Sequence, residues 1–271
     1  MRFPKIRNSI LAFRIAWRQK KPVLITYIIL RFIVLAALVL SITNGDYDSA
    51  FICVLVLVLF MVPAFIQDAF SVELPSVLEI IILVFIFAAE ILGELSNFYV
   101  NYDHWDTLLH TTWGFLCAAV GFSLVDVLNR TENIKFQLSP IFLAVVAFCF
   151  SMTIGVMWEF FEFSVDRLFD KDMQKDTVIH SFASVTLDET HQNIPILVSD
   201  ITEVTINGES LGVDGYLDIG LYDTMEDLFV NFVGALVFSI IGYLDARTNG
   251  QSRIARSLIP RVSKRPKKSK K

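Results

Sequence analysis

The sequence has little charge. Only 19% of its 271 residues are charged, whereas 54% are hydrophobic and 13% are aromatic. Soluble domains usually carry about 25% charged residues. This chain therefore has too little polar surface for a soluble globular domain, and its composition indicates a membrane protein.

The sequence also lacks the signatures of several enzyme classes. It has no His-Glu-x-x-His zinc-protease helix, no Gly-x-Ser-x-Gly turn, no glycine-rich phosphate loop and no His-box set of a membrane desaturase. Its three cysteines, Cys53, Cys117 and Cys149, lie in apolar runs without metal-ligand spacing, so we interpret them as packing residues. No small-residue cleavage pattern follows the first apolar run, so no cleavable signal is predicted.

Positive charge is confined to the two ends of the chain. Residues 1–22 hold seven Lys or Arg residues and no acid, and residues 245–271 hold ten with one acid, which together make 17 of the 23 basic residues. Because the lysine-rich end follows a hydrophobic segment, we expect the basic termini to contact anionic lipid at a membrane surface and not nucleic acid.

Six runs of about 20 apolar residues predict an all-α polytopic membrane protein with six transmembrane helices. The predicted helices cover residues 23–42, 50–70, 76–98, 105–127, 140–164 and 225–244. The resulting organisation is a basic amphipathic interfacial helix (1–22), helices 1–5 (23–164), an extracytoplasmic loop (165–224), helix 6 (225–244) and a basic cytoplasmic tail (245–271).

The positive-inside rule orients these helices. The N-terminus, the turn after helix 4 (Arg130, Lys135) and the C-terminal tail are basic, whereas the turn after helix 1 has no basic residue. We therefore predict that both termini are cytoplasmic and that the 165–224 loop, which is rich in acids, lies outside.

The 165–224 loop is predicted to be a small β-rich insertion. Asn207-Gly208 lies between β-prone residues, which is a strong hairpin signal. The segment TVIHSFASVTL is typical of another strand, and VDGYLD, with Asp214 and Asp218, is typical of an acidic turn.

Polar residues gather at the predicted outer ends of four helices. Helical spacing places them in one stripe on each helix. The stripes are Glu90 and Glu94; Asp103, Asp106 and His110; Glu159, Glu162 and Asp166; and Asp223, Asp227 and Asn231. A carboxylate in hydrocarbon costs several kcal/mol unless it is paired or metal-bound, so we expect these stripes to face one another around an outward-facing pocket.

The pocket has the ligand types of a divalent metal site. We expect Asp106, His110, Glu159 and Asp227 to bind one Zn²⁺, Mn²⁺ or Mg²⁺ ion, with Glu159, Glu162 and Asp227 as candidate catalytic groups. The same residue types also suit a proton or cation relay without a bound metal. Structural contacts between helices are a third interpretation.

Several polar residues have simpler interpretations. Asp103 and Asp223 suit helix N-caps. Arg31 lies deep in helix 1, where a structural ion pair with Asp68, Glu79 or Asp126 is the first interpretation and substrate binding the second. Trp105, Trp113 and Trp158 are typical of the aromatic belt at a membrane interface.

Three segments resemble known membrane proteins. They are DTLLHTTWGF (Asp106, His110, Gly114), WEFFEF (Glu159, Glu162) and DLFVNFVGAL (Asp227, Asn231, Gly234). Together they resemble VanZ-like membrane proteins, and they are more similar still to the YjdF-type inner-membrane proteins of bacteria. The resemblance implies a multi-pass protein of the bacterial plasma membrane and implies no particular reaction. The VanZ type is associated with resistance to a lipoglycopeptide antibiotic.

Three functions are compatible with these observations. The first is a metal-assisted hydrolase or transferase that acts on a lipid or a lipid-linked envelope precursor at the outer leaflet. The second is a cation- or proton-coupled transporter. The third is a non-catalytic envelope or resistance component whose outer insertion binds a partner. The sequence does not identify a substrate.

Overall fold

The structure is a computed structural model that describes residues 20–69, 72–129, 138–248 and 251–262. The chain divides into two units. The first contains the chain up to Thr153 together with the chain from Val230, and the second is Ile154–Phe229. Helices α8 and α9 run from one unit into the other. The predicted interfacial helix at residues 1–22 lies almost wholly outside the described residues.

Among the described residues, six segments are helical, long and apolar enough to cross a membrane. They are α2 (Lys21–Thr43), α3 with α4 (Tyr47–Leu59, Val62–Ala69), α5 with η1 (Ser76–Phe87, Ala88–Leu95), α7 (Trp105–Asn129), α8 (Pro140–Phe169) and α9 (Leu221–Arg247). Large apolar side chains on these helices are exposed, including Phe32 (74%) and Phe51 (69%), as expected of surfaces that face lipid. The predicted all-α polytopic fold is confirmed.

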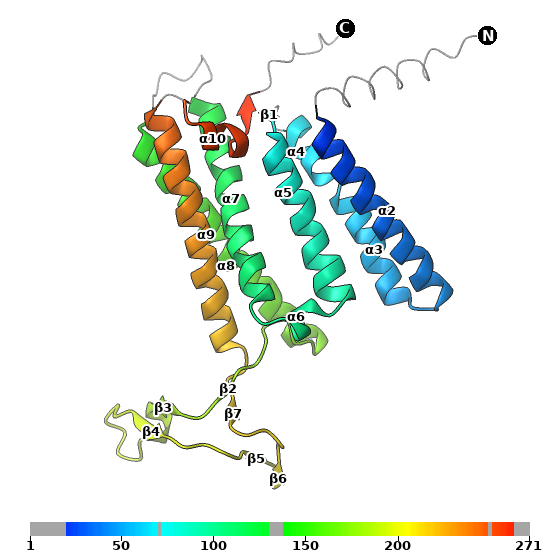
Figure 1. The fold of residues 1–271 in the computed structure, drawn as a ribbon. Helices are drawn as coiled ribbons and strands as arrows, with labels where there is room; N and C mark the ends of the chain where they lie inside the picture. The colour runs from blue at the N-terminus through cyan, green and yellow to red at the C-terminus, as the bar shows by residue number, and fades with distance from the viewer. Residues whose placement is uncertain (1–19, 70–71, 130–137, 249–250, 263–271) are drawn as a thin grey trace, which may run out of the picture. The chain divides into compact units, whose positions relative to one another are not determined.

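The first unit has two hydrophobic cores. One lies among α2, α3, α5 and η1, and its fully buried side chains include Val34, Cys53 and Phe60. The other is built from α5, α7, α8, α9 and the short helix α10 (Arg253–Leu258), which are labelled in Figure 1. Leu78, Phe122 and Phe238 are buried in this second core. Cys53 and Cys117 are buried, in agreement with their interpretation as packing residues, whereas Cys149 is exposed on α8.

Helices α7 and α9 approach each other closely because both carry glycine at the contact. A Cβ atom at Gly234 would lie 2.0 Å from the backbone oxygen of Thr111, and one at Gly114 would lie 2.2 Å from the backbone oxygen of Asn231. The Oγ of Ser151 on α8 donates a hydrogen bond of 2.7 Å to the Gly114 oxygen. Backbone-to-backbone packing of this kind is typical of membrane helices with small residues at the interface.

At one end of the first unit, three segments that are far apart in the sequence contact one another. The ammonium of Lys20, at the start of α2, donates to Glu79 Oε2 (2.6 Å) and to the Leu74 oxygen (3.1 Å). Strand β1 (Val72–Glu73) pairs antiparallel with β8 (Arg261–Val262), and Ile259 is buried in the same hydrophobic core as Leu74. The start of α2 and the C-terminal segment therefore lie at the same end of this unit, as an even number of spans requires.

The second unit contains the last turns of α8, the insertion and the first turns of α9. The insertion has three two-stranded antiparallel sheets. They are β2 (Val178–Ile179) with β7 (Tyr216–Leu217), β3 (Phe182–Ser184) with β4 (Ile196–Val198), and β5 (Thr205–Ile206) with β6 (Glu209–Ser210). The predicted small β-rich insertion is confirmed.

Of two more detailed predictions for the insertion, one is confirmed and the other is wrong. Asn207 (φ 55°) and Gly208 (φ 89°) form the turn between β5 and β6, and positive φ at both positions is what a two-residue hairpin turn requires. The single strand predicted for TVIHSFASVTL is wrong. That segment forms two strands that pair with different partners, β2 with β7 and β3 with β4, followed by a 3₁₀ turn, η2 (Val185–Leu187).

Two short elements connect the helices at the other end of the first unit. The span formed by α5 ends in a π-helix, η1, which carries Glu90 and Glu94. It is followed by α6 (Phe98–Asn101). A Cβ atom at Gly93 would overlap the ring of Tyr99, so glycine lets the chain after η1 fold back onto it. π-Helical turns are rare and are often found at functional sites.

Candidate functional site

Three buried carboxylates lie together in the second unit. Glu159 and Glu162 are one helical turn apart on α8, and Asp227 lies on α9. Their exposed fractions are 5%, 6% and 4%. One carboxylate oxygen from each residue lies within 4.8 Å of the others. Oxygens on opposite sides of a Ca²⁺ or Mg²⁺ ion are about 4–5 Å apart, so this acid cluster could hold one cation.

Neutral donors contact two members of the acid cluster. The indole nitrogen of Trp158 donates to Glu162 Oε1 at 2.8 Å. The amide nitrogen of Gln174 lies 3.4 Å from Glu159 Oε2. Trp158 was expected to be an interface aromatic, and the structure gives it a further role because its hydrogen bond orients the Glu162 carboxylate. Hydrogen bonds of this kind fix the geometry of metal-ligating carboxylates in proteins.

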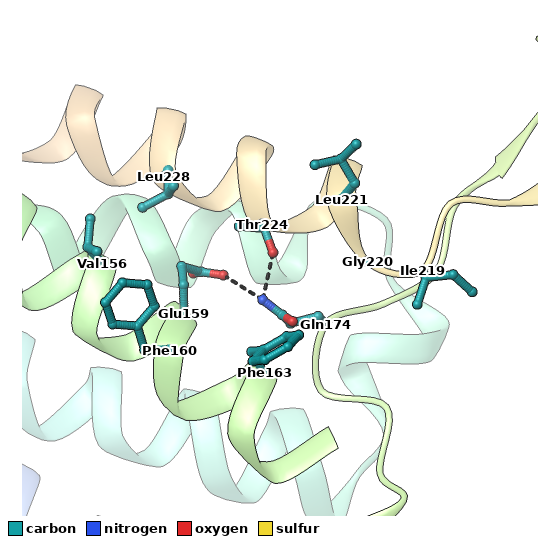
Figure 2. A pocket seen from close by; sticks show the side chains of 10 residues that line it. All are labelled: Val156, Glu159, Phe160, Phe163, Gln174, Ile219, Gly220, Leu221, Thr224 and Leu228. Carbon is teal, nitrogen blue, oxygen red and sulfur yellow. Dashed lines mark hydrogen bonds between the residues drawn. The ribbon is translucent and has the colours of Figure 1, made fainter. Parts of the chain in front are cut away.

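Gln174 is held in place from both helices of the second unit. The two carboxylate oxygens of Asp166 on α8 accept the backbone N–H groups of Met173 (2.6 Å) and Gln174 (2.9 Å). On α9, Thr224 Oγ1 accepts a hydrogen bond of 2.6 Å from the Gln174 amide nitrogen. Figure 2 shows this nitrogen between the Glu159 carboxylate and the Thr224 hydroxyl. Asp166 therefore supports the acid cluster through Gln174.

An open groove of about 370 Å³ runs beside Glu159. Its walls are mostly apolar and come from α8, from the end of the insertion and from α9 (Figure 2). The lining residues are Val156, Glu159, Phe160, Phe163, Gln174, Ile219, Gly220, Leu221, Thr224 and Leu228. Pockets that bind small molecules typically combine such apolar walls with a few polar groups.

The other predicted site residues lie in the first unit. Asp106 and His110 are one turn apart on α7, with His110 Nε2 3.6 Å from Asp106 Oδ1. Asn231 on α9 is 1% exposed, and its amide nitrogen lies 3.5 Å from the sulfur of Met152. Glu94 on η1 is exposed, and so is Asp103, which precedes α7 by two residues.

Arg31 contacts an aromatic ring in the structure. It is exposed on α2, and its guanidinium lies 5.0 Å from the centre of the Tyr27 ring. Glu79, one of its three predicted partners, accepts a hydrogen bond from Lys20. The observed contact is therefore a cation–π interaction within one helix.

The N-cap prediction for Asp223 is wrong. Helix α9 begins at Leu221, so Asp223 lies inside its first turn and accepts the backbone N–H of Lys175 at 2.9 Å. The carboxylate that binds the start of α9 is that of Asp218, which accepts the N–H of Tyr222 at 2.6 Å. Asp218 also accepts the N–H of Thr177 at 2.7 Å. The acidic turn predicted for VDGYLD is correct only for its first half, because Tyr216 and Leu217 form strand β7.

Sequence reasoning found the acid cluster but missed the residues around it. Glu159, Glu162 and Asp227 were predicted to lie together, and the second unit brings all three together. Gln174 and Thr224 were not predicted, because neither lies on a charged stripe and Gln174 belongs to a loop. The signal in the sequence that pointed to a supporting loop was Asp166. This carboxylate lies one turn beyond Glu162 with no cation beside it on the helix face.

One protein family matches most of the chain. The profile of a family described as "Predicted membrane protein (DUF2238)" matches residues 25–248. The chain belongs to this family. The match to DUF2238 covers the insertion and nearly all of the six candidate spans. YjdF-type proteins are this family, so that resemblance is confirmed, and the VanZ-like resemblance stays a prediction. No curated protein and no solved structure is significantly similar to the chain.

Proposed function

We propose that Glu159, Glu162 and Asp227 bind one divalent cation and that this site is the reaction centre of a membrane enzyme. The enzyme acts on a lipid or a lipid-linked envelope substrate in the bacterial plasma membrane. Both termini are cytoplasmic, so the site faces outward. A cation held by these three carboxylates would lower the pKa of a bound water molecule, and Glu159 would accept the proton of that water as a general base.

The observation that carries this proposal is the geometry of the acid cluster. Three carboxylates, each at least nine-tenths buried, lie with oxygens within 4.8 Å of one another. Three negative charges so close together in a buried place repel strongly unless protons or a cation neutralise them. A bound divalent cation neutralises two charges at once, and it lets a buried site remain ionised at neutral pH.

The ligand type favours hard cations. The acid cluster offers only carboxylate oxygens, which suit Mg²⁺, Mn²⁺ and Ca²⁺ better than Zn²⁺. Zinc usually requires histidine or cysteine ligands. The sequence prediction that Asp106 and His110 complete the ligand set would supply an imidazole. The identity of the bound metal therefore distinguishes a site of three carboxylates from a larger ligand set that includes Asp106 and His110.

Elemental analysis of the purified full-length protein tests the proposal directly. We expect about one Mg²⁺, Mn²⁺ or Ca²⁺ per chain in wild type after dialysis against micromolar metal, and none in Glu162→Gln or Asp227→Asn. Asp172→Asn is the matched control, because Asp172 is an exposed acid of the same unit that is not in the acid cluster. Equal metal content in all four proteins would contradict the proposal.

The His110→Ala variant tests the sequence prediction separately. If His110 is a ligand, the wild-type protein retains Zn²⁺ and the variant loses it. If only the carboxylates bind, the variant retains Mg²⁺ or Mn²⁺ with wild-type affinity. Neither result tests whether Glu162 and Asp227 bind the cation. That question is decided by the metal content of Glu162→Gln and Asp227→Asn.

A second candidate function is a proton- or cation-coupled transporter. The observation that favours it is a set of buried polar residues along three helices of the first unit. They are Ser123, Asp126, Ser151, Asn231, Ser239 and Asp245. Buried ionisable residues in membrane helices often mark ion or proton pathways. Proton movement into liposomes that is present in wild type and lost in Asp126→Asn would support this function over catalysis.

A further inference from the structure

The groove beside Glu159 has one polar patch in otherwise apolar walls. Among its ten lining residues, only Glu159, Gln174 and Thr224 have polar side chains, and none is Lys or Arg. The sole charge in the groove is therefore negative. A head group that ends in an anionic group would meet repulsion there, whereas one that ends in a cationic group with hydrogen-bond donors would be attracted.

The apolar walls belong to surfaces that face lipid. Phe160 (66% exposed) and Phe163 (51% exposed) lie on α8, and Leu221 (61% exposed) lies on α9, all within candidate membrane spans. From Phe163 to Val156 the groove follows α8 for two turns, about 10 Å at 1.5 Å per residue. This direction leads from the end of α8 into the span. An apolar chain in the groove would thus run in the direction of the surrounding acyl chains.

The Gln174 amide marks the position of a nitrogen donor. Its Nε2 lies 2.6 Å from Thr224 Oγ1 and 3.4 Å from Glu159 Oε2. The second of these distances is long for a hydrogen bond to a carboxylate. An ammonium nitrogen in the same position could donate to both oxygens, and charge-assisted hydrogen bonds are about twice as strong as neutral ones. Gln174 therefore occupies a place that an ammonium would fill more favourably.

We propose that this groove binds a membrane lipid with a primary ammonium head group. The ammonium replaces the Gln174 amide between Glu159 and Thr224, and one acyl chain lies along Val156, Phe160 and Leu228. A primary ammonium has three N–H donors, so the two oxygens and one water satisfy it. This site requires no metal, and it goes beyond the proposed function by identifying a lipid class.

Lipid binding to the metal-free protein tests this proposal. Native mass spectrometry of the full-length protein in chelator would compare short-chain phosphatidylethanolamine, phosphatidylcholine and phosphatidylglycerol. The first two have the same net charge, but the quaternary ammonium of phosphatidylcholine has no N–H donor. We expect phosphatidylethanolamine to bind roughly tenfold more tightly than either of the others. Equal binding of phosphatidylcholine or of phosphatidylglycerol would overturn the proposal.

Substitutions distinguish the contribution of the head-group site to lipid binding from that of the groove walls. We expect Glu159→Gln and Thr224→Val to remove the preference for phosphatidylethanolamine, and Gln174→Ala to strengthen binding because a competing donor is lost. Unchanged or weaker binding in Gln174→Ala would contradict the assigned position of the nitrogen. Phe160→Ala should weaken binding of the lipid, whereas Phe161→Ala, a neighbouring aromatic outside the groove lining, should not.

The two proposals can fail independently. Because lipid binding is measured in chelator, a protein that binds no metal can still prefer the ammonium lipid. Glu162→Gln and Asp227→Asn remove cation ligands but leave Glu159 and Thr224 in place, so both variants should keep the lipid preference. Loss of that preference in these two variants would show that lipid binding depends on the whole acid cluster and would overturn the proposal.

Discussion

At the scale of single residues, Glu159 belongs to two sites of different chemistry. One is the acid cluster with Glu162 and Asp227, and the other is the mostly apolar groove. A carboxylate has two oxygens and about four lone-pair positions, so one side chain can serve both. Glu159→Gln keeps the shape of the side chain and removes its charge. It should therefore impair metal binding and lipid selectivity together, whereas the other variants separate them.

Gly234 should be sensitive to the smallest possible substitution. In Gly234→Ala the new methyl group would lie 2.0 Å from the Thr111 oxygen, so α7 and α9 would have to separate. We expect a loss of about 1–3 kcal/mol in stability, despite the better helix propensity of alanine. Thermal unfolding in detergent, followed by tryptophan fluorescence, would measure it.

Gly93→Ala is the control for that prediction. Its methyl group would overlap only the ring of Tyr99, a side chain that can turn away, and no backbone atom is among the three nearest contacts. We expect a clearly smaller shift in the melting temperature than for Gly234→Ala. A larger shift would mean that the contact between η1 and Tyr99 is more rigid than the contact between the two glycine-bearing helices.

Asp188 should make the insertion sensitive to strong acid. Hydrogen bonds from the Thr190 side chain, and then from the backbone N–H groups of Ile194, Thr190 and Gln192, lower the pKa of Asp188 from 3.8 to about 2. Because the pKa is lower in the folded state, this contribution to stability is complete above about pH 4 and is lost as the pH falls through 2.

Hydrogen exchange of the β3–β4 hairpin tests the prediction for Asp188. In wild type, protection of residues 182–198 should be constant above pH 4 and should fall between pH 4 and pH 2. In Asp188→Asn protection should be lower, and the part of the pH dependence that comes from this carboxyl group should be absent. A wild-type profile without any change in this pH window would contradict the pKa assignment.

At the scale of elements, local sequence signals predicted some structures and not others. The Asn207-Gly208 turn was predictable because few residues other than glycine and asparagine accept positive φ readily. The π-helix η1 was not, because its apolar residues follow the same pattern as an α-helix. The strand predicted for TVIHSFASVTL was split because strand pairing depends on distant partners, which local propensity does not specify.

The β5–β6 hairpin should depend on Gly208. At φ 89° an alanine side chain is strained, so Gly208→Ala should weaken the hairpin by about 1 kcal/mol. Both strands are exposed and pair only with each other, so the loss should stay local. Hydrogen exchange should increase for residues 204–211 alone. Faster exchange throughout the insertion would show that this hairpin supports the other two sheets.

At the scale of the whole molecule, periodicity and hydropathy were sufficient to predict the six spans. A run of about 20 apolar residues has few alternatives in a bilayer. The same reasoning brought Glu159, Glu162 and Asp227 together, because buried carboxylates need partners. It could not show that α10 contributes to a core of the first unit or that β8 pairs with β1, since the sequence after Arg247 is basic and carries no long apolar run.

Deletion of residues 251–271 should destabilise the first unit. The deletion removes Ala255 and Ile259 from a hydrophobic core and removes the partner of β1. Burial of an isoleucine side chain contributes roughly 1.5–3 kcal/mol, so the melting temperature should fall by several degrees. Deletion of residues 263–271 alone is the control for lost positive charge. An equal fall in both truncated proteins would assign the effect to charge.

The pairing of β2 with β7 has a consequence for the length of the insertion. Val178 faces Leu217, so the chain leaves and returns at neighbouring positions about 5 Å apart. Everything between them can be shortened, extended or exchanged without altering the distance between the last turn of α8 and the first turn of α9. This pair of strands is therefore a natural place to graft a reporter domain or an epitope while the transmembrane part stays intact.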